Sequence, residues 1–237
     1  MKSQPTLPAL LLLLCLSAFG CRMPDAAEQP PLIAVSNFLH PPFSSRDADG
    51  NAVGIEVDVI EMAAHSLGRR VEWRELAFAE LLNAVASDEA DIAAATIGVT
   101  EPRKRLVAFT KPYFQTEIVA LTRPGGGEPA TLDALRGKRV ATDRGTTAVE
   151  ATVKRIPEAI RVLVRPAGRT WAQMLLAGEV DAIVLDRSHV SKFTADAGVD
   201  LQLIDEPLRE EFFALAVGLD ATDLRAALDR VIEKRSK

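Results

Sequence analysis

Short apolar runs alternate with amphipathic segments from residue 32 onward. Apolar stretches at 32–35, 71–73 and 91–95 predict strands. The segments 58–67 and 78–86 carry apolar residues at helical spacing and predict the helices between those strands. Because strands that alternate with helices pair in parallel, the first part of the chain predicts a small α/β unit.

The alternation returns after Gly125-Gly126-Gly127, the strongest break in the pattern. The expected strands and helices of this second part lie at 139–142, 146–155, 160–164, 170–177 and 182–185. Each part is too small to form a complete doubly wound domain. We therefore expect two α/β lobes with a ligand cleft between them, outside the carboxyl ends of the strands.

Two extended segments are suited to cross between the lobes. The first is 117–122, which is rich in β-branched residues, and the second is 212–217. Because the chain crosses out and back, the last helix, at 224–232, should rejoin the first lobe. The predicted boundaries are 32–118 and 209–237 for lobe one, and 119–208 for lobe two.

The N-terminal segment predicts export. Residues 1–20 read as a signal peptide, with Lys2 ahead of an apolar run that is short for a membrane span. Cys21 follows Ala18-Phe19-Gly20, which resembles a lipobox, so 21–31 would be a lipidated tether. The alternative is ordinary cleavage after Gly20. With Cys15 removed and Cys21 acylated, the mature chain has no thiol for a disulfide, a nucleophile or a metal site.

Composition narrows the function classes. The net charge is −5 and the chain has no long basic run, so nucleic-acid binding is not expected. The three histidines form no HExxH motif, and no GxSxG or Walker loop is present. We therefore expect no enzyme activity, no cofactor and no metal site.

The stretch AATIGVTEPRKR at 94–105 carries the clearest candidate chemistry. Small and hydroxylated residues follow an apolar strand and precede Arg103. Small residues allow a ligand to approach the backbone, and a guanidinium matches the geometry of a carboxylate. The alternative is a solvated basic patch, because Lys104 and Arg105 adjoin Arg103. The strand-end context favours an anion site.

Five motifs in order resemble family 3 of the bacterial solute-binding proteins, the periplasmic components of polar amino-acid ABC importers. The likeness covers residues 32 to about 235. The motifs are Pro42-Phe43 with GNAVGIEVD at 50–58, Ala90-Asp91-Ile92 with Thr100-Glu101-Pro102-Arg103, Val107-Ala108-Phe109-Thr110 with Pro112-Tyr113, LRGKRV at 135–140 with Gly145-Thr146-Thr147, and GEVDA at 178–182 through Asp186. The resemblance implies a type II periplasmic binding protein fold with two crossover hinge strands.

The resemblance also implies roles for individual residues. Arg103 would bind the α-carboxylate of the ligand in a bidentate manner, with donors around Thr96 and Gly98. Many members carry Ser or Thr in place of Gly98, so one side-chain donor is missing here. Asp186, at the end of an apolar strand, would bind the α-ammonium group. Its alternative role is to cap the helix that starts near Arg187.

Further residues complete the implied site. Thr146 or Thr147 would help to hold the carboxylate at a helix N-terminus, or would merely cap that helix. Phe78 would lie against the ligand or pack in the core. His40 would replace a stacking aromatic residue. Asn37 would replace an aspartate found in binders of basic side chains, which weakens the expectation of a lysine, arginine or histidine ligand.

The resemblance implies an extracytoplasmic, monomeric protein that delivers a polar amino acid or a similar small zwitterion to ABC permease subunits. It would be lipid-anchored in the periplasm or at the cell surface. Two alternatives remain open. One is an enzyme resembling cyclohexadienyl dehydratase, although neither Glu75, Glu101 nor His40 is singled out as its acid or base. The other is a ligand-sensing regulatory subunit.

Overall fold

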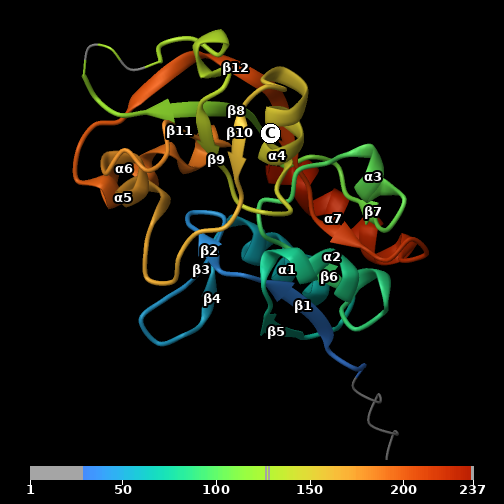
Figure 1. Ribbon diagram of the computed structural model, residues 1–237. Coiled ribbons are helices and arrows are strands. Elements are labelled where there is room, and N and C mark those ends of the chain that lie inside the picture. Colours follow the sequence, from blue (N-terminus) through green and yellow to red (C-terminus); the bar gives the residue numbers. More distant parts are fainter. Residues whose placement is uncertain (1–28, 126, 128, 236–237) are drawn as a thin grey trace, which may run out of the picture.

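The computed structural model describes residues 29–125, 127 and 129–235. The predicted signal peptide and Cys21 lie outside the described residues. The described chain forms two five-stranded sheets and a small three-stranded sheet. In Figure 1 the second large sheet and its helices lie above the first. The two-lobed α/β fold is confirmed.

The first large sheet has the strand order β5-β1-β6-β13-β7. Its strands are β1 (Leu32–Ser36), β5 (Val71–Glu75), β6 (Ile92–Ala93), β7 (Ala108–Phe109) and β13 (Ala216–Val217). Three helices cover it: α1 (Ile55–Ser66), α2 (Phe78–Ala86) and α7 (Thr222–Arg235). Leu32 packs with α1 and α7 on one face, and Val35 packs with α2 on the other. This alternation of side chains buries the sheet on both faces, as its parallel strands β5, β1 and β6 require.

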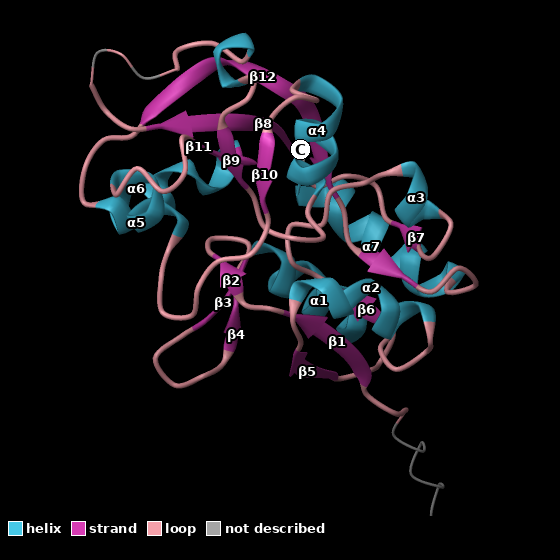
Figure 2. Cartoon of the chain, viewed as in Figure 1, coloured by secondary structure: helices cyan, strands magenta, loops and turns pink. Residues whose placement is uncertain are grey.

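The second large sheet has the order β10-β9-β11-β8-β12. Its strands are β8 (Phe114–Thr122), β9 (Arg139–Ala141), β10 (Ile160–Val162), β11 (Ala182–Asp186) and β12 (Gln202–Phe213). The helices beside it are α4 (Thr147–Arg155), α5 (Trp171–Leu176) and α6 (Val190–Ala197), with 3-10 turns η1 (Asp133–Leu135) and η2 (Arg187–His189). Val140 and Val184 pack with α4, whereas Ala141 and Ile183 pack with α5. Figure 2 shows these helices on either side of the strands.

Two antiparallel strands connect the large sheets. Strand β8 pairs with β12 from Phe114–Phe213 to Ile118–Arg209, and again between Ala120 and Ile204 after a shift in register. The two crossings expected from the sequence are therefore present and are adjacent. The segment 212–217 is not a single strand, however, because β12 ends at Phe213 and β13 begins at Ala216.

Several element boundaries differ from the sequence prediction. Helix α1 begins at Ile55 rather than at residue 58, and the strand expected over 91–95 pairs only at Ile92–Ala93. Three residues after this strand, Thr96 adopts a left-handed backbone conformation, with φ of 49°. The hairpin strands β2 (Leu39–His40), β3 (Ser44–Arg46) and β4 (Ala52–Val53) were not predicted. They are too short to produce a hydrophobic pattern.

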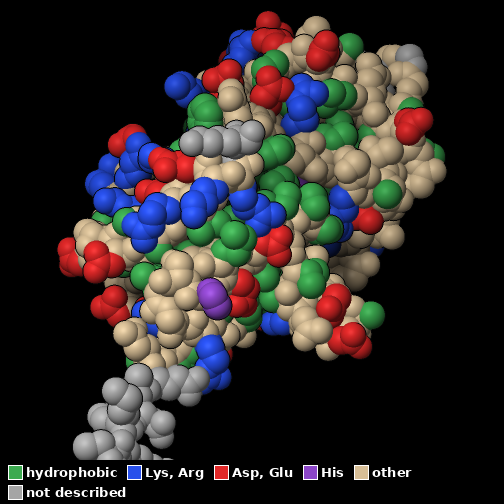
Figure 3. All heavy atoms as spheres, turned by 180° about the vertical axis from the view of Figure 1, so that it is seen from behind, with side chains coloured by type: hydrophobic (Ala, Val, Ile, Leu, Met, Phe, Trp, Pro, Cys, Tyr) green, Lys and Arg blue, Asp and Glu red, His purple; other side chains and the backbone are tan. Residues whose placement is uncertain are grey.

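The surface carries both charge signs. Figure 3 shows acidic and basic side chains interspersed on the face opposite to that of Figure 1. Many of them pair, as in the contact of Arg136 with Glu158 at 2.6 Å. Within the described residues, no helix is long and apolar enough to cross a membrane. The same part of the chain contains no cluster of three or more His, Cys, Asp or Glu side chains placed to hold a metal ion.

Candidate ligand-binding site

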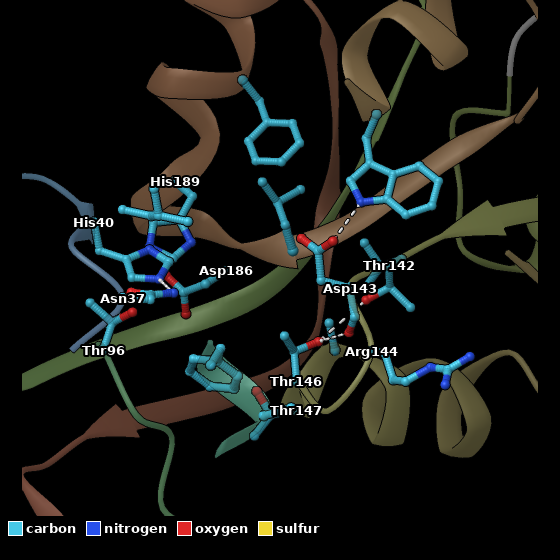
Figure 4. Close-up of a pocket in the computed structure, with 18 of the residues that line it drawn as sticks. Asn37, His40, Thr96, Thr142, Asp143, Arg144, Thr146, Thr147, Asp186 and His189 are labelled. Atoms are coloured by element: carbon cyan, nitrogen blue, oxygen red, sulfur yellow. Dashed lines mark hydrogen bonds between the residues drawn. The ribbon is translucent and has the colours of Figure 1, made fainter. Parts of the chain in front are cut away.

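A cavity of about 980 Å³ is lined by residues of both lobes. Its walls include seven of the nine residues predicted to bind ligand: Asn37, His40, Phe78, Thr96, Thr146, Thr147 and Asp186. Figure 4 shows two groups on opposite sides of the cavity, one around Asp186 and the other around Thr146. Gly98 and Arg103 do not line the cavity. Gly98 lies against Glu211, which does line the cavity.

Asp186 ends β11 and is 7% exposed. Its Oδ1 accepts hydrogen bonds from the Ser188 N–H at 2.8 Å and from the Thr116 hydroxyl at 2.9 Å. Its Oδ2 is buried and has no hydrogen-bond partner among the described residues. Burial raises the pKa of the Asp186 carboxyl group. Asp186 therefore caps η2, which was one of its two predicted roles, and its Oδ2 remains able to accept a hydrogen bond.

A polar cluster adjoins Asp186. The Asn37 Nδ2 lies 3.2 Å from the His40 Nε2, and the His40 Nδ1 lies 3.1 Å from the His189 Nε2. The two imidazoles stack, with ring centroids 4.6 Å apart. Burial lowers the pKa of His40 to about 3 and that of His189 to about 4, so both rings are neutral at pH 7. The Asn37 Oδ1 is buried without a hydrogen-bond partner among the described residues.

Thr96 is fixed by a buried carboxylate beneath the cavity. Its N–H donates to the Glu56 Oε1 at 3.0 Å, and its hydroxyl donates to the Ala95 carbonyl at 2.8 Å. The Tyr113 hydroxyl donates to the same Glu56 oxygen. Burial raises the pKa of the Glu56 carboxyl group. The backbone N–H of Thr96 is therefore not available to a ligand in this arrangement.

Arg103 lies in α3 (Glu101–Lys104), which Thr100 caps by accepting from the Arg103 N–H at 3.3 Å. The guanidinium donates to the Gly98 carbonyl at 2.6 Å and to the Gly145 carbonyl at 3.0 Å. It also lies over the ring of Phe78, at 5.7 Å from the centroid. Burial is the main cause of its lowered pKa. Arg103 therefore connects the first lobe to the loop before α4.

Glu211 was not predicted from the sequence. It lies near the end of β12, is 3% exposed, and accepts a hydrogen bond from the Thr147 hydroxyl at 2.8 Å. Its other oxygen lies 3.3 Å from the Arg209 guanidinium. The charged run Arg209-Glu210-Glu211 resembles a solvated loop, so the sequence alone gave no signal for a buried carboxylate.

An aromatic wall was also missed. Trp171, at the start of α5, is 3% exposed and donates its Nε1 hydrogen to the Asp143 Oδ1 at 2.8 Å. The backbone carbonyl of the same Asp143 accepts a hydrogen bond from the Thr146 hydroxyl at 2.7 Å, so the Thr146 side chain does not cap α4. Since the chain has only two tryptophans, the scarcity of this residue was the available signal.

Three comparisons relate the chain to known proteins. The profile of the family described as bacterial extracellular solute-binding proteins, family 3, matches residues 32–237. The L-arginine-binding protein of Pseudomonas aeruginosa is 29% identical over 216 residues, covering 89% of this chain and 82% of that protein. The L-cystine-binding protein TcyJ of Escherichia coli is 26% identical over 211 residues, covering 89% and 79%.

Solved structures show the same similarity. The holo ArgBP from T. maritima aligns with a TM-score of 0.73 and 29% identity, covering 88% of this chain and 91% of that one. An ancestral arginine-binding protein bound to arginine aligns with a TM-score of 0.76 and 25% identity, covering 88% and 93%. These alignments extend over both lobes and the hinge strands.

Proposed function

Because this chain belongs to family 3 of the bacterial extracellular solute-binding proteins, we propose that it captures a polar amino acid or a similar small zwitterion for an ABC importer. The observation that supports this ligand class most directly is the pair of unpaired buried acceptors in the cavity, the Asp186 Oδ2 and the Asn37 Oδ1. Buried polar atoms normally have partners, and an ammonium group would supply donors to both.

The opposite end of the ligand would carry its carboxylate toward Thr147, Thr146 and Arg103. Thr147 lines the cavity from the first turn of α4, where backbone N–H groups favour an anion, and its hydroxyl donates to Glu211. The Arg103 guanidinium donates to the carbonyls of Gly98 and Gly145. A bidentate contact with the ligand would require the guanidinium to exchange one of these carbonyls for the carboxylate. Gly98 would contribute backbone rather than side chain, and Phe78 would form part of the wall.

A ligand bridging the two lobes would favour the closed arrangement. The ammonium partner Asp186 belongs to β11 of the second sheet, whereas Asn37, His40 and Thr96 come from the first lobe. The closed form gains these contacts only when ligand is present. We place the lobe boundaries near residues 118 and 209, where β8 and β12 pair.

A transport role also fits the location that family members share, outside the cytoplasm. We propose that Cys21 carries a lipid anchor, that the protein is a monomer, and that it docks on ABC permease subunits. The dehydratase alternative is not favoured, because the family and the relatives named above are binding proteins.

A thermal-shift screen of the amino acids tests the proposal, with L-arginine and L-cystine first because relatives are named for them. We expect at least one compound to raise the unfolding temperature and to bind in calorimetry with one-to-one stoichiometry. Small-angle scattering should then show a more compact protein. If no amino acid or related zwitterion shifted the transition, the proposed ligand class would be wrong.

A further inference from the structure

The carboxylate of Glu211 occupies the place where the ligand carboxylate is expected. It accepts the Thr147 hydroxyl hydrogen bond, which the ligand would otherwise receive. It also lies directly over Gly98. A Cβ atom at residue 98 would lie 1.8 Å from the Glu211 Oε1 and 2.7 Å from its Cδ. The absence of a side chain at Gly98, noted above as a departure from the family, therefore makes room for Glu211.

The charges around this carboxylate leave no excess of positive charge. Glu211 faces Arg209 from its own strand, and it is close enough to Arg103 of α3 for electrostatic attraction. Arg209 also lies 3.7 Å from Glu150 of α4, and Asp186 of β11 adds repulsion to Glu211. Two arginines thus stand against two glutamates, with Asp186 nearby. A ligand carboxylate would bring one negative charge too many into a buried site.

We propose that Glu211 is a ligand-binding residue that acts in its neutral form, so that capture of a carboxylate ligand takes up one proton from solvent. The neutral acid would keep its acceptor contact with Thr147 and donate its own hydrogen to the ligand carboxylate. The only covalent change is that one oxygen of the Glu211 carboxylate binds a proton from solvent. This proposal rests on the proposed function, because it concerns the carboxylate of an amino-acid ligand.

Independent support comes from the surroundings of the free carboxyl group. Burial raises the pKa of Glu211 even before ligand arrives, with Asp186 adding to the effect. The contacts of Thr147 and Arg209 oppose this rise. A second negative charge placed beside the group would push its pKa further in the same direction, as in other paired carboxylates.

The test uses a matched pair of probes, L-arginine and its carboxamide, or the same pair for whichever amino acid gives the largest shift in the screen. Calorimetric titrations are run in phosphate and in Tris, whose ionisation enthalpies differ, so the difference in heat counts the protons taken up. Between about pH 6 and about pH 8, where the α-ammonium group of the amino acid stays protonated, the uptake should rise toward one and the affinity should fall by up to about tenfold per pH unit. With the carboxamide, any uptake comes from its α-amino group, whose pKa the amide lowers, and it should be equal in the wild type and in Glu211→Gln.

Two variants complete the experiment. In Glu211→Gln the amide imitates the neutral acid, so over the same pH range the amino acid should bind without proton uptake at residue 211 and with an affinity that no longer falls as the pH rises. Glu210→Gln, next in the chain but exposed, should behave as the wild type. Equal proton uptake by the wild type and by Glu211→Gln on binding the amino acid at about pH 8 would overturn the role of Glu211 and leave the proposed function intact. If no amino acid and no carboxamide bound to the protein, both the role of Glu211 and the proposed function would be wrong.

Discussion

Asp186→Asn provides the most direct test of the ammonium site. The substitution keeps the Oδ1 acceptor that holds the Ser188 N–H and the Thr116 hydroxyl. It replaces the unpaired Oδ2 with an NH₂ group and removes the charge. An ammonium group bound at this position would meet a donor in place of an acceptor. The change therefore affects the ligand contact and spares the local backbone.

The expected loss follows from burial. Removing one partner of a buried, hydrogen-bonded charge pair costs about 2–5 kcal/mol, and Asp186 is only 7% exposed. We expect a loss of about 3 kcal/mol or more, which corresponds to a weakening of binding of about 100-fold or greater. Calorimetric titration of the wild type and the variant with the same amino acid measures it.

Asp186→Asn should weaken ligand binding, but it should not destabilise the ligand-free protein. The pKa of Asp186 is raised in the folded protein, so the folded state binds this proton more tightly than the unfolded chain does. The contribution of Asp186 to the free energy of unfolding therefore falls as the pH rises from about 4 through the raised pKa. In Asp186→Asn this loss is absent, and the ligand-free protein should be at least as stable as the wild type at pH 7.

A nearby carboxylate serves as the control. Asp196, on α6 at the rim of the cavity, is exposed and pairs with Lys192 at 3.2 Å. Asp196→Asn should leave binding within about threefold of the wild type, since exposed pairs contribute less than about 1 kcal/mol. If Asp186→Asn bound the amino acid as tightly as the wild type, the ammonium group would lie elsewhere. If both variants lost the same binding free energy, Asp186 would act through the overall negative potential of the cavity and not through a direct contact with the ammonium group.

Three further predictions concern other parts of the chain. Arg103→Ala should weaken amino-acid binding by about 2–5 kcal/mol and Arg103→Lys by less, while Lys104→Ala should have little effect in the same titration. Because the pKa values of His40 and His189 lie below that of the free imidazole, the unfolded chain takes up more protons between about pH 6.5 and about pH 4. The unfolding temperature should therefore drop as the pH falls through that window, and it should drop less in His40→Gln. Mass spectrometry of the exported protein should show a lipid adduct on Cys21, and an unmodified cysteine there would contradict the lipobox interpretation.

Arg103→Ala should also lower the stability of the ligand-free protein. An arginine exposed in an open cleft would contribute little to folding, but here the guanidinium donates to the carbonyls of Gly98 and Gly145. Both acceptors lose their partner in Arg103→Ala. The variant should therefore also unfold at a lower temperature, and its binding must be measured below that transition.

The sequence predicted the parts of the fold that depend on repeated patterns. Helix α2 was predicted with its observed bounds, because Leu81 and Val85 mark its apolar face and Ser87 ends it. Strand β12 was mostly missed, because Pro207 and the charged residues around it resemble a loop. These residues are tolerated because β12 is an edge strand with a shift in register between Ile204 and Arg209.

The sequence predicted the cavity residues that stand at the ends of apolar strands. It did not predict those that are buried only because distant segments meet. Asp186 could be identified because it ends an apolar strand. Glu211 could not, because its burial depends on Gly98, Thr147 and Arg103, which are between 64 and 113 residues away in the sequence. No local pattern encodes such a meeting of segments.

The pairing of β8 with β12 has a mechanical consequence. Two separate connecting strands would let the lobes twist and slide as well as open. A hydrogen-bonded ribbon, paired from Phe114–Phe213 to Ile118–Arg209, resists shear along its length and bends most easily across its plane. The lobes should therefore move about a single axis near this ribbon. A permease that docks on the protein would then meet one of two conformations, open or closed, and the closed one would report that ligand is bound.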